Sequence, residues 1–337
     1  MRKIIAILLF FFSFVLLAPM SGHPDDYDDI HAHDIALVGK LRTEWSAEYK
    51  NGFFLSATVD SLNLFRASNS SLPLVGTTFV PGVTDIVNSS DLNLGLAAGM
   101  EIQILGRYGN FGGDVNYFSI FEWSANKGLT SVGGAAVNFA TPIGNTAFPA
   151  DISVEYVSKL HNVEANFRWY PIDKLALIVG SRFMKLDEEL EIIHDVGPGL
   201  NVADIDIDAE NDLWGGQIGV AGEFFQYGGL SLDGWAKGGY FANNISTEGE
   251  VTQQIGPNFD ADEDDRKGTF STDFGINANY NITPSLKLSL GYHLLWIEEV
   301  ATSLEQVPAL DPVNGTGSVI TNDVLFNGFR GGITFTW

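Results

Sequence analysis

The stretch from Phe270 to Trp296, FSTDFGINANYNITPSLKLSLGYHLLW, alternates between apolar and polar residues. Apolar residues occupy nearly every even position from Phe270 to Ile282, and again from Leu286 to Trp296. Residues 281–285, Asn-Ile-Thr-Pro-Ser, separate the two runs and are typical of a tight turn. Side chains that alternate with a period of two lie on opposite faces of a β-strand. The stretch therefore predicts two strands joined by a short turn.

The same alternation recurs along the chain. Every even position from Leu92 to Ile104 is apolar, and the odd positions include Glu101 and Gln103. Weaker versions indicate strands near residues 53–64, 114–123, 163–169, 175–183, 214–224, 230–240 and 324–337. These patterns predict about ten strands. An extra hairpin formed by residues 131–140 and 151–157 would raise the number to twelve.

The connections between the predicted strands fall into two kinds. Short turns rich in Gly, Pro, Asn and Asp lie near residues 106–112, 170–173, 226–229 and 281–285. Long, often acidic segments lie near residues 65–91, 124–160, 187–212, 242–268 and 299–320, and the two kinds alternate strictly. Outer-membrane barrels have short periplasmic turns and longer extracellular loops. The rhythm therefore predicts an all-β fold, a transmembrane antiparallel up-and-down β-barrel with both ends of its chain on the periplasmic side.

Aromatic residues mark both ends of the predicted strands. Trp169 and Tyr227 lie beside short turns. The residues at the points where strands enter long segments are Trp123, Trp214, Tyr240, Phe241 and Trp296. Two aromatic bands around an apolar belt are typical of membrane barrels. A soluble β-sandwich would also alternate, but it gives no reason for the short and long rhythm or for the two bands.

The first residues have the pattern of a secretory signal. Arg2 and Lys3 precede an apolar run from Ile4 to Leu17, which is shorter than the ~18 residues expected of a spanning helix. We therefore expect a cleaved signal peptide at residues 1–22, with an uncleaved anchor as the alternative. An acidic, flexible leader at residues 23–52 and the barrel at residues 53–337 would follow. This organisation predicts the outer membrane of a Gram-negative-type bacterium.

Composition excludes several classes of protein. The chain has 337 residues, with 42 Asp and Glu against 18 Lys and Arg, for a formal net charge of -24. Nucleic acid is therefore not an expected partner, because its phosphates require basic residues. The chain has no cysteine, which excludes disulfides and thiolate metal sites.

The last residues resemble the terminal signal that the outer-membrane barrel assembly machinery recognises. Phe329, Ile333, Phe335 and Trp337 share one face of the last predicted strand, and the final residue is aromatic. The barrel assembly machinery and outer-membrane lipid are accordingly the expected partners.

Four stretches resemble the putative β-barrel porin-7 family of planctomycete-type outer membranes. They are residues 163–168, 178–186, 214–219 and 230–239, which read VEANFR, IVGSRFMKL, WGGQIG and LSLDGWAKGG. The resemblance extends from about Phe53 to Trp337. It implies an outer-membrane location and a pore-forming role, and it assigns no functional residues.

If the apolar faces contact lipid, the opposite faces line the lumen. The lumen candidates are Glu101, Gln103, Asp114, Glu122, Glu164, Arg168, Arg182, Glu223, Asp233, Lys237, Asp273, Lys287, His293 and Arg330. Charges at bilayer depth are tolerated where they face water or a partner. We expect a narrow, cation-preferring pore for small solutes, or alternatively a filled, non-conducting barrel with a structural or adhesive role. Barrels of about 8 strands are filled by side chains, so about ten strands lie near the filled end.

Metal and catalytic sites have weaker support. Acidic residues cluster at residues 204–212 and 260–265, where divalent cations could bind, but neither segment has the EF-hand spacing. His23, His31 and His33 could bind zinc or copper, but a disordered polar leader is the favoured explanation, because the segment has no surrounding core to fix ligands. A hydrolase using His161 or the His194-Asp195 pair is a further alternative, although no Gly-x-Ser-x-Gly elbow is present. We expect no catalytic residues, no metal and no cofactor.

Overall fold

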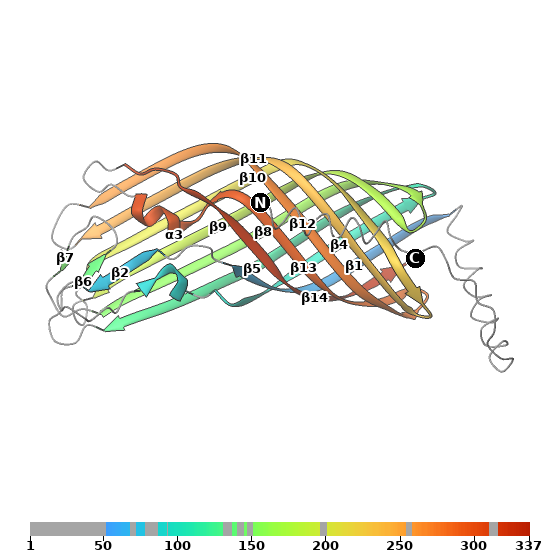
Figure 1. The fold of residues 1–337 in the computed structure, drawn as a ribbon, viewed down its shortest axis with the longest axis horizontal. Coiled ribbons are helices and arrows are strands. Elements are labelled where there is room, and N and C mark those ends of the chain that lie inside the picture. Colours follow the sequence, from blue (N-terminus) through green and yellow to red (C-terminus); the bar gives the residue numbers. More distant parts are fainter. Residues whose placement is uncertain are drawn as a thin grey trace.

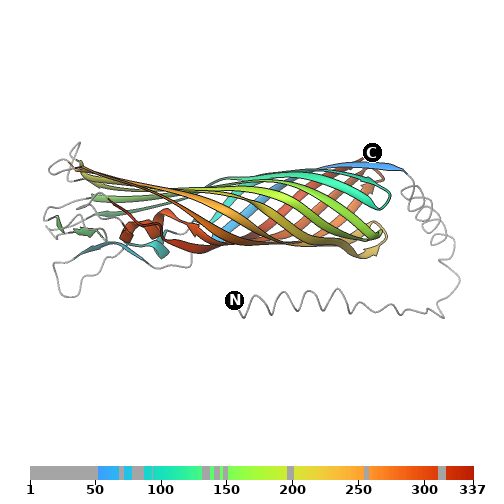
Figure 2. The ribbon, with the colours of Figure 1, turned by 90° about the horizontal axis from the view of Figure 1, so that it is seen from above.

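Ten long strands close into a barrel in the computed structural model (Figures 1 and 2). The structure describes residues 52–67, 72–77, 87–92, 94–130, 137–139, 145–146, 151–195, 201–253, 258–309 and 316–337. Residues 1–51, which include the predicted signal peptide and nearly all of the predicted leader, lie outside this set. The barrel strands are β1 (Phe53–Ala67), β4 (Leu96–Tyr108), β5 (Phe111–Thr130), β8 (Asp151–Ile172), β9 (Leu175–Asp195), β10 (Asn201–Tyr227), β11 (Leu230–Gln253), β12 (Phe259–Thr283), β13 (Leu286–Ala301) and β14 (Thr321–Thr336).

Every neighbouring pair of barrel strands is antiparallel, and β1 pairs with both β4 and β14. Within the closed ring each strand pairs on both sides, as lipid requires. Residues 259–270 of β12 lie beyond this ring and pair with β11 alone. The predicted up-and-down barrel of about ten strands is confirmed. No helix among the described residues is long and apolar enough to cross a membrane.

The short turns all lie at one end of the barrel, together with the end of β14 (Figure 1). They join β4 to β5, β8 to β9, β10 to β11 and β12 to β13 through two residues each. Gly109 and Gly228 take positive φ angles of 57° in two of these turns, a conformation that favours glycine. We call this end of the barrel the short-turn end.

Small elements lie at the opposite end. A four-stranded sheet contains β2 (Pro73–Thr77), β3 (Val87–Asn88), β6 (Val137–Phe139) and β7 (Asn145–Thr146). Short helical turns are η1 (Ser89–Asp91), α3 (Ser303–Gln306) and η2 (Val307–Ala309). The extra hairpin considered for residues 131–140 and 151–157 is not part of the barrel, because β6 joins the small sheet and residue 151 begins β8.

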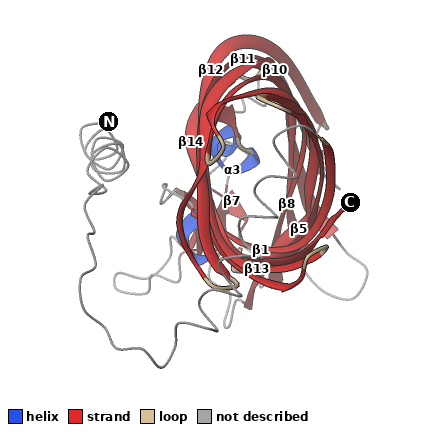
Figure 3. Cartoon of the chain, turned by 90° about the vertical axis from the view of Figure 1, so that its right-hand side faces the viewer, coloured by secondary structure: helices blue, strands red, loops and turns tan. Residues whose placement is uncertain are grey.

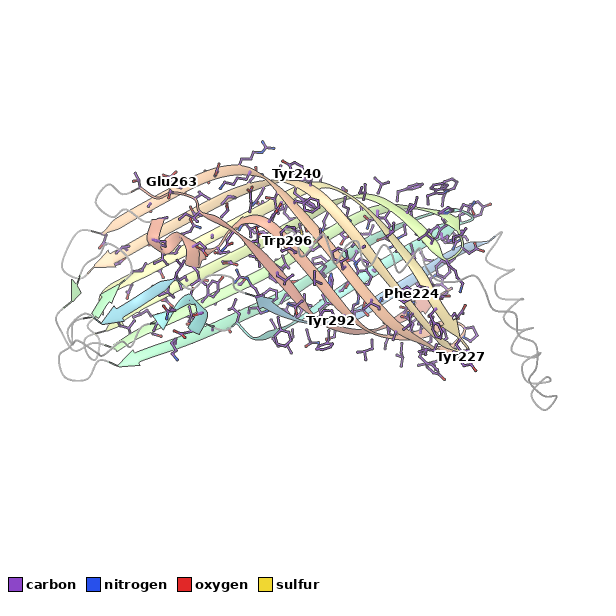
Figure 4. All side chains as sticks on the ribbon, in the orientation of Figure 1. Phe224, Tyr227, Tyr240, Glu263, Tyr292 and Trp296 are labelled. Atoms are coloured by element: carbon purple, nitrogen blue, oxygen red, sulfur yellow. The ribbon has the colours of Figure 1, made fainter. Side chains whose placement is uncertain are left out.

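The exterior near the short-turn end is apolar. Ile218, Leu290 and Val59 are 70%, 66% and 55% exposed, as expected of a surface that contacts lipid. Exposed aromatic residues lie at both limits of this belt, with Tyr227 beside a short turn and Tyr240 farther along β11 (Figure 4). The predicted bands are present, but Trp123 and Phe241, which were also expected in the band farther from the short turns, are 1% exposed and lie inside the barrel.

Beyond Trp214 and Tyr240, strands β8–β12 continue as what we call the extension: residues 151–160, 185–195, 201–213, 241–253 and 258–269. The prediction of long loops at 187–212 and 242–268 is therefore corrected, since most of these residues belong to strands. The reason lies in the alternation Asp204-Ile205-Asp206-Ile207-Asp208, in which the isoleucines are buried and the acids face outward. Burial of the isoleucines stabilises the strand despite the acidic composition.

The inside of the barrel beyond its middle is packed with apolar side chains. They form one buried cluster, which we call the apolar plug: Leu62, Leu64, Ile120, Trp123, Leu160, Met184, Leu186, Leu190, Leu213, Phe241, Leu295 and Phe326. Each is at most 1% exposed. The strands form a closed ring when viewed from the short-turn end, and α3 lies inside its outline (Figure 3).

Candidate functional site in the barrel interior

A cavity of about 1180 Å³ occupies the interior at the short-turn end. Its rim includes Asp173, Lys174, Gly228 and Pro284, which belong to or adjoin three of the short turns. Deeper walls come from strands β1, β4, β5 and β8–β14. None of the residues of the apolar plug lines the cavity. The cavity is thus open among the short turns, and the plug lies beyond its inner end.

Most of the residues predicted to face the lumen line this cavity. They are Glu101, Gln103, Glu164, Arg168, Glu223, Asp233, Lys237, Asp273, Lys287, His293 and Arg330. Arg182 is 2% exposed and lies beside them, bonded to Asp273. Asp114, the remaining polar candidate on β5, is buried and pairs with Arg168. These residues meet in the interior because alternate residues of each strand point into the barrel, and the candidates occupy those positions.

Glu122 is the exception, because its predicted place in the lumen is wrong. Its side chain is exposed, whereas the neighbouring Trp123 is 1% exposed and belongs to the apolar plug. The pairing of β5 with β8 shifts between Ile120 and Trp123. Such a bulge inserts an extra residue and exchanges the faces of all residues after it. The indole N–H of Trp123 donates to the carbonyl oxygen of Leu64 at 2.8 Å, which fixes the ring inside.

Asp273 is the centre of a buried cluster at the inner end of the cavity. Four nitrogen atoms surround its carboxylate: Nη1 of Arg182 at 2.9 Å, Nε1 of Trp235 at 2.6 Å, Nε2 of His293 at 3.0 Å and Nζ of Lys237 at 3.2 Å. A Cβ at Gly275 would lie 2.1 Å from the ring of Trp235, so glycine is needed for this ring to pack against β12. The cluster replaces water around a buried charge with fixed donors.

Glu164 extends this cluster toward β8 and β10. Nζ of Lys237 donates to both of its carboxylate oxygens, at 2.9 and 2.8 Å. Nε2 of Gln217 donates to Oε2 at 2.7 Å, and Nδ2 of Asn166 donates to the same oxygen at 3.2 Å. Both charged partners are almost fully buried, and each has a second partner, because Lys237 also contacts Asp273 and Glu164 lies 3.9 Å from Nε of Arg182. Removal of either one would therefore unbalance the whole cluster.

Arg330 holds a second set of charges on the opposite wall. It pairs with Asp60 on β1, and its Nη1 lies 3.1 Å from Oε2 of Glu101 on β4. Nδ2 of Asn116 donates to Oε1 of Glu101 at 2.5 Å. The guanidinium also lies over the ring of Trp235, 4.8 Å from its centroid. Arg330 thus ties β14 to β1 and β4 across the point where the barrel closes.

Asp60 and Trp235 are functional candidates that sequence reasoning missed. Asp60 shares its strand face with Leu62 and Leu64, which are buried inside the barrel. Trp235 lies on the same strand face as Asp233 and Lys237, so the alternation along this strand could have identified it as a residue that faces the interior. For Asp60, a single acidic residue in an apolar strand was the available signal.

The chain after β13 folds into the barrel rather than away from it. Glu299 takes a positive φ of 50°, and we call residues 299–309 the inward-folded segment. Asn211 on β10 anchors it, because Nδ2 donates to the carbonyl of Ala301 at 2.7 Å and Oδ1 accepts from its amide at 2.8 Å. Leu304 and Val307 are buried. The segment therefore adds to the filling of the interior.

A buried carboxylate fastens the start of α3. Glu188 on β9 accepts hydrogen bonds from the hydroxyl of Tyr156 at 2.6 Å and from the amide of Ser303 at 3.3 Å, and it pairs with Arg66. Burial raises the pKa of Glu188, against the opposing effect of the Arg66 guanidinium. Glu188 and Asn211 are thus two of the polar side chains that hold the inward-folded segment, beside Gln306, which bonds the backbone of Ile320.

The four residues of the predicted assembly signal face outward. Phe329, Ile333, Phe335 and Trp337 are 57%, 47%, 55% and 65% exposed. They alternate with Arg330 and Thr334, which are buried on the inner face. The last strand therefore presents an aromatic stripe to the exterior, where a membrane or a protein could contact it.

The candidate catalytic and metal residues give no assembled site. Oγ of Ser119 lies 3.0 Å from Nδ1 of His161, but Ser119 is 1% exposed and Tyr117 also contacts this nitrogen, at 3.3 Å. A nucleophile must be reachable by its substrate, so this pair reads as a satisfied polar contact. The described residues hold no group of three or more metal-ligating side chains. The side chains of His194 and Asp195, and the whole of His23, His31 and His33, lie outside the described residues.

Comparison with known proteins identifies one family. The family model described as "Putative beta barrel porin-7" matches residues 135–321, which is 187 residues and more than half of the chain. The stretch is shorter than the resemblance expected from Phe53 to Trp337. No curated protein sequence matches the chain.

Several solved structures share the barrel architecture at low similarity. The outer membrane protease OmpT from Escherichia coli is 12% identical, with 85% of this chain and 98% of that chain covered and a TM-score of 0.48. The translocator domain of autotransporter NalP from Neisseria meningitidis is 11% identical, with 92% and 98% covered and a TM-score of 0.35. The Ralstonia pickettii toluene transporter TbuX is 11% identical, with 85% and 89% covered and a TM-score of 0.31. Likenesses at this level carry no functional argument.

Proposed function

The chain belongs to the putative beta barrel porin-7 family and is an outer-membrane β-barrel, and from this premise we propose that it is a gated pore for small polar solutes. The observation that carries the proposal is the division of its interior. A polar cavity of about 1180 Å³ fills the short-turn end, and the apolar plug fills the rest. A barrel of this kind would take up solutes from one side and conduct only after the inward-folded segment leaves the interior and the side chains of the apolar plug repack.

The short-turn end faces the periplasm in this proposal, as in other outer-membrane barrels. Outer-membrane lipid would contact the apolar belt, and the barrel assembly machinery would recognise the aromatic stripe of β14. The signal peptide at residues 1–22 would be removed during export. The proposal assigns the chain no enzymatic activity and no cofactor.

The charges that line the cavity support weak ion selectivity rather than the expected cation preference. Seven carboxylates line it: Asp60, Glu101, Glu164, Asp173, Glu223, Asp233 and Asp273. Six cations oppose them: Arg107, Arg168, Lys174, Lys237, Lys287 and Arg330. Selectivity follows the charge of the lining, and this lining is nearly balanced although the whole chain is strongly acidic.

The inward-folded segment is the best candidate for the moving part. Its strand pairing with β14 ends at Val300 and Ala301, and beyond them polar side chains hold it, with two hydrogen bonds from Asn211 at Ala301. Loss of those bonds would cost little compared with opening the barrel wall. The segment could therefore leave the interior while the ten strands stay closed.

Conductance across a planar lipid bilayer tests the proposal. The wild-type chain should give rare, brief openings, and Asn211→Ala should raise the open fraction at least several-fold by releasing the segment. Asn244→Ala is a matched control, because Asn244 lies on β11 with an exposed side chain. A wild-type pore that is continuously open, or an Asn211→Ala variant that is as silent as the wild type, would contradict gating by this segment.

A second candidate function is a non-conducting surface barrel. It is favoured by nine outward-facing carboxylates on the extension, which we call the acidic wall: Glu155, Glu191, Asp206, Glu250, Asp260, Glu189, Asp208, Glu248 and Asp262. Divalent cations could screen this wall or bridge it to other surface anions. Complete electrical silence of the wild type and of every variant of the inward-folded segment would favour this second function.

A further inference from the structure

The charges that line the cavity are almost all paired with one another. Eleven of the thirteen take part in an ion pair, either across the cavity wall or at its rim. Among the residues that the structure describes, Asp233 and Lys287 line the cavity without any ion pair. The two unpaired groups have opposite charge. A paired charge is already neutralised, so these two are the groups that a solute could use.

Asp233 is positioned for this purpose by two carboxamides on β12. Nδ2 of Asn277 donates to its Oδ1 at 2.9 Å, and Nδ2 of Asn279 donates to its Oδ2 at 2.7 Å. Asn279 itself is 1% exposed, so the orientation of the carboxylate is fixed from behind. Each carboxylate oxygen can accept a further hydrogen bond. The site therefore offers a rigid, unneutralised anion to a cationic group.

Lys287 is the complementary cation on β13, nearer the short-turn end. Asp233 on β11 pairs in register with Asn277 on β12, which pairs with Gly291 on β13. Lys287 lies four residues before Gly291 on the same strand. Two strand spacings of about 5 Å and four residues of about 3.3 Å place the two backbones about 16 Å apart. Both side chains line the cavity. Side chains that lean toward each other would bring the charges within about the length of two or three residues of extended peptide.

We propose that the cavity binds a small zwitterionic solute, with its ammonium group on Asp233 and its carboxylate on Lys287. A short peptide is the chemistry that fits this spacing, and the ammonium end enters first. A neutral solute would leave both charges unused, and a simple ion would use only one of them. The inference rests on the proposed function for its biological purpose, whereas binding itself does not require the inward-folded segment to move.

Titration calorimetry of the full chain in detergent micelles tests the proposal with three probes. Trialanine carries both charges, N-acetyl-trialanine lacks the ammonium, and trialanine amide lacks the carboxylate. Trialanine should bind about 10-fold more tightly than either capped peptide, because each charged contact contributes a charge-assisted hydrogen bond. Asp233→Asn should weaken trialanine and the amide about 10-fold without changing N-acetyl-trialanine. Lys287→Met should weaken trialanine and N-acetyl-trialanine without changing the amide.

Glu248→Gln is the matched control, because it removes a carboxylate from the acidic wall outside the cavity and should leave all three affinities unchanged. Retention of the β-sheet circular dichroism signal shows that each variant is folded. Equal affinity for the three probes would overturn the proposal, and so would the absence of heat with any of them. Since calorimetry does not depend on conductance, silence in the bilayer with peptide binding would separate failure of gating from failure of this site.

Discussion

The membrane-facing half of the barrel and its extension are built with opposite polarity on the same strands. On β10, Ile218 faces outward and Gln217 faces the charged cluster, whereas farther along Asp206 faces outward and Ile207 is buried in the interior. The period of two continues through both regions. The difference is therefore in the surroundings, which change from lipid to water, and not in the backbone. Polar side chains face inward where the exterior is lipid, and apolar ones face inward where the exterior is water.

The comparison teaches that the two regions are stabilised by different forces. In the membrane-facing half, the interior is a network of paired charges around Asp273 and Glu164. In the extension, the interior is an ordinary apolar core that includes Leu190 and Ile205. Substitutions in the two regions should therefore fail for different reasons.

The largest effect is expected in the charged interior. Asp273→Ala should lower the free energy of unfolding by about 3–5 kcal/mol, because Arg182 and Lys237 would lose a shared buried counter-charge. Urea unfolding in lipid vesicles, followed by tryptophan fluorescence, measures the change. A loss below about 1 kcal/mol would mean that the cluster is hydrated rather than buried.

Truncation of the extension core should have the next largest effect. Leu190 is 0% exposed, so Leu190→Ala should cost about 2–5 kcal/mol through lost burial and the cavity left behind. Glu189→Ala, the neighbouring outward residue, should change stability by less than about 0.5 kcal/mol. The same unfolding assay compares the two, and equal effects would show that the extension is not a packed core.

A charge placed on the two exteriors should separate the regions further. Ile218→Lys puts a charge against lipid and should cost about 2–4 kcal/mol if the site is near the middle of the bilayer. Asp208→Lys, on the same face of the same strand, should be neutral or stabilising because it relieves repulsion within the acidic wall. Refolding yield into vesicles measures both. A tolerated lysine at 218 would contradict contact with lipid.

The smallest effect is a pH dependence confined to the acidic wall. Partial burial and the neighbouring carboxylates raise the pKa of Glu191, Asp206 and Asp208. The folded chain therefore binds protons more tightly than the unfolded chain. Stability should fall as pH rises from the ordinary carboxyl values of 4.5 and 3.8 through the raised pKa values.

Hydrogen exchange of the extension at pH 4 and pH 7 measures this effect, with greater protection expected at pH 4. The triple variant Glu191→Gln, Asp206→Asn, Asp208→Asn should flatten the difference. Lower protection at pH 4 than at pH 7, relative to the intrinsic exchange rate at each pH, would show that the wall is stabilised by its charges.

The sequence predicted the barrel because alternation is a local property. The strands near Phe270–Trp296 and the short turns follow directly from it. The extension was missed because acidic residues at 204–212 have the composition of a loop, although the isoleucines between them keep the period of two. Glu122 was placed inside because nothing local reveals the bulge between Ile120 and Trp123.

The sequence predicted most of the residues that line the candidate site, but it did not predict which of them pair with one another. The alternation along each strand indicated that Glu164, Asp273 and Arg330 face the interior. The pairing of Arg330 with Asp60 could not be predicted in this way, because it joins positions 270 residues apart and depends on where the barrel closes. The inward-folded segment likewise depends on Asn211 and Glu188, which lie on distant strands.

β1 pairs with β14, so the ring is closed by the two barrel strands that are farthest apart in the sequence. The backbone of Trp337 exchanges hydrogen bonds with Leu55 at 3.0 and 3.1 Å, so the seam is fastened down to its last residue. Until β14 arrives, both β1 and β13 present open ladders that no lipid can satisfy. Closure of the ring must therefore wait for β14, and the time for which these two ladders stay unpaired would determine how fast the barrel matures.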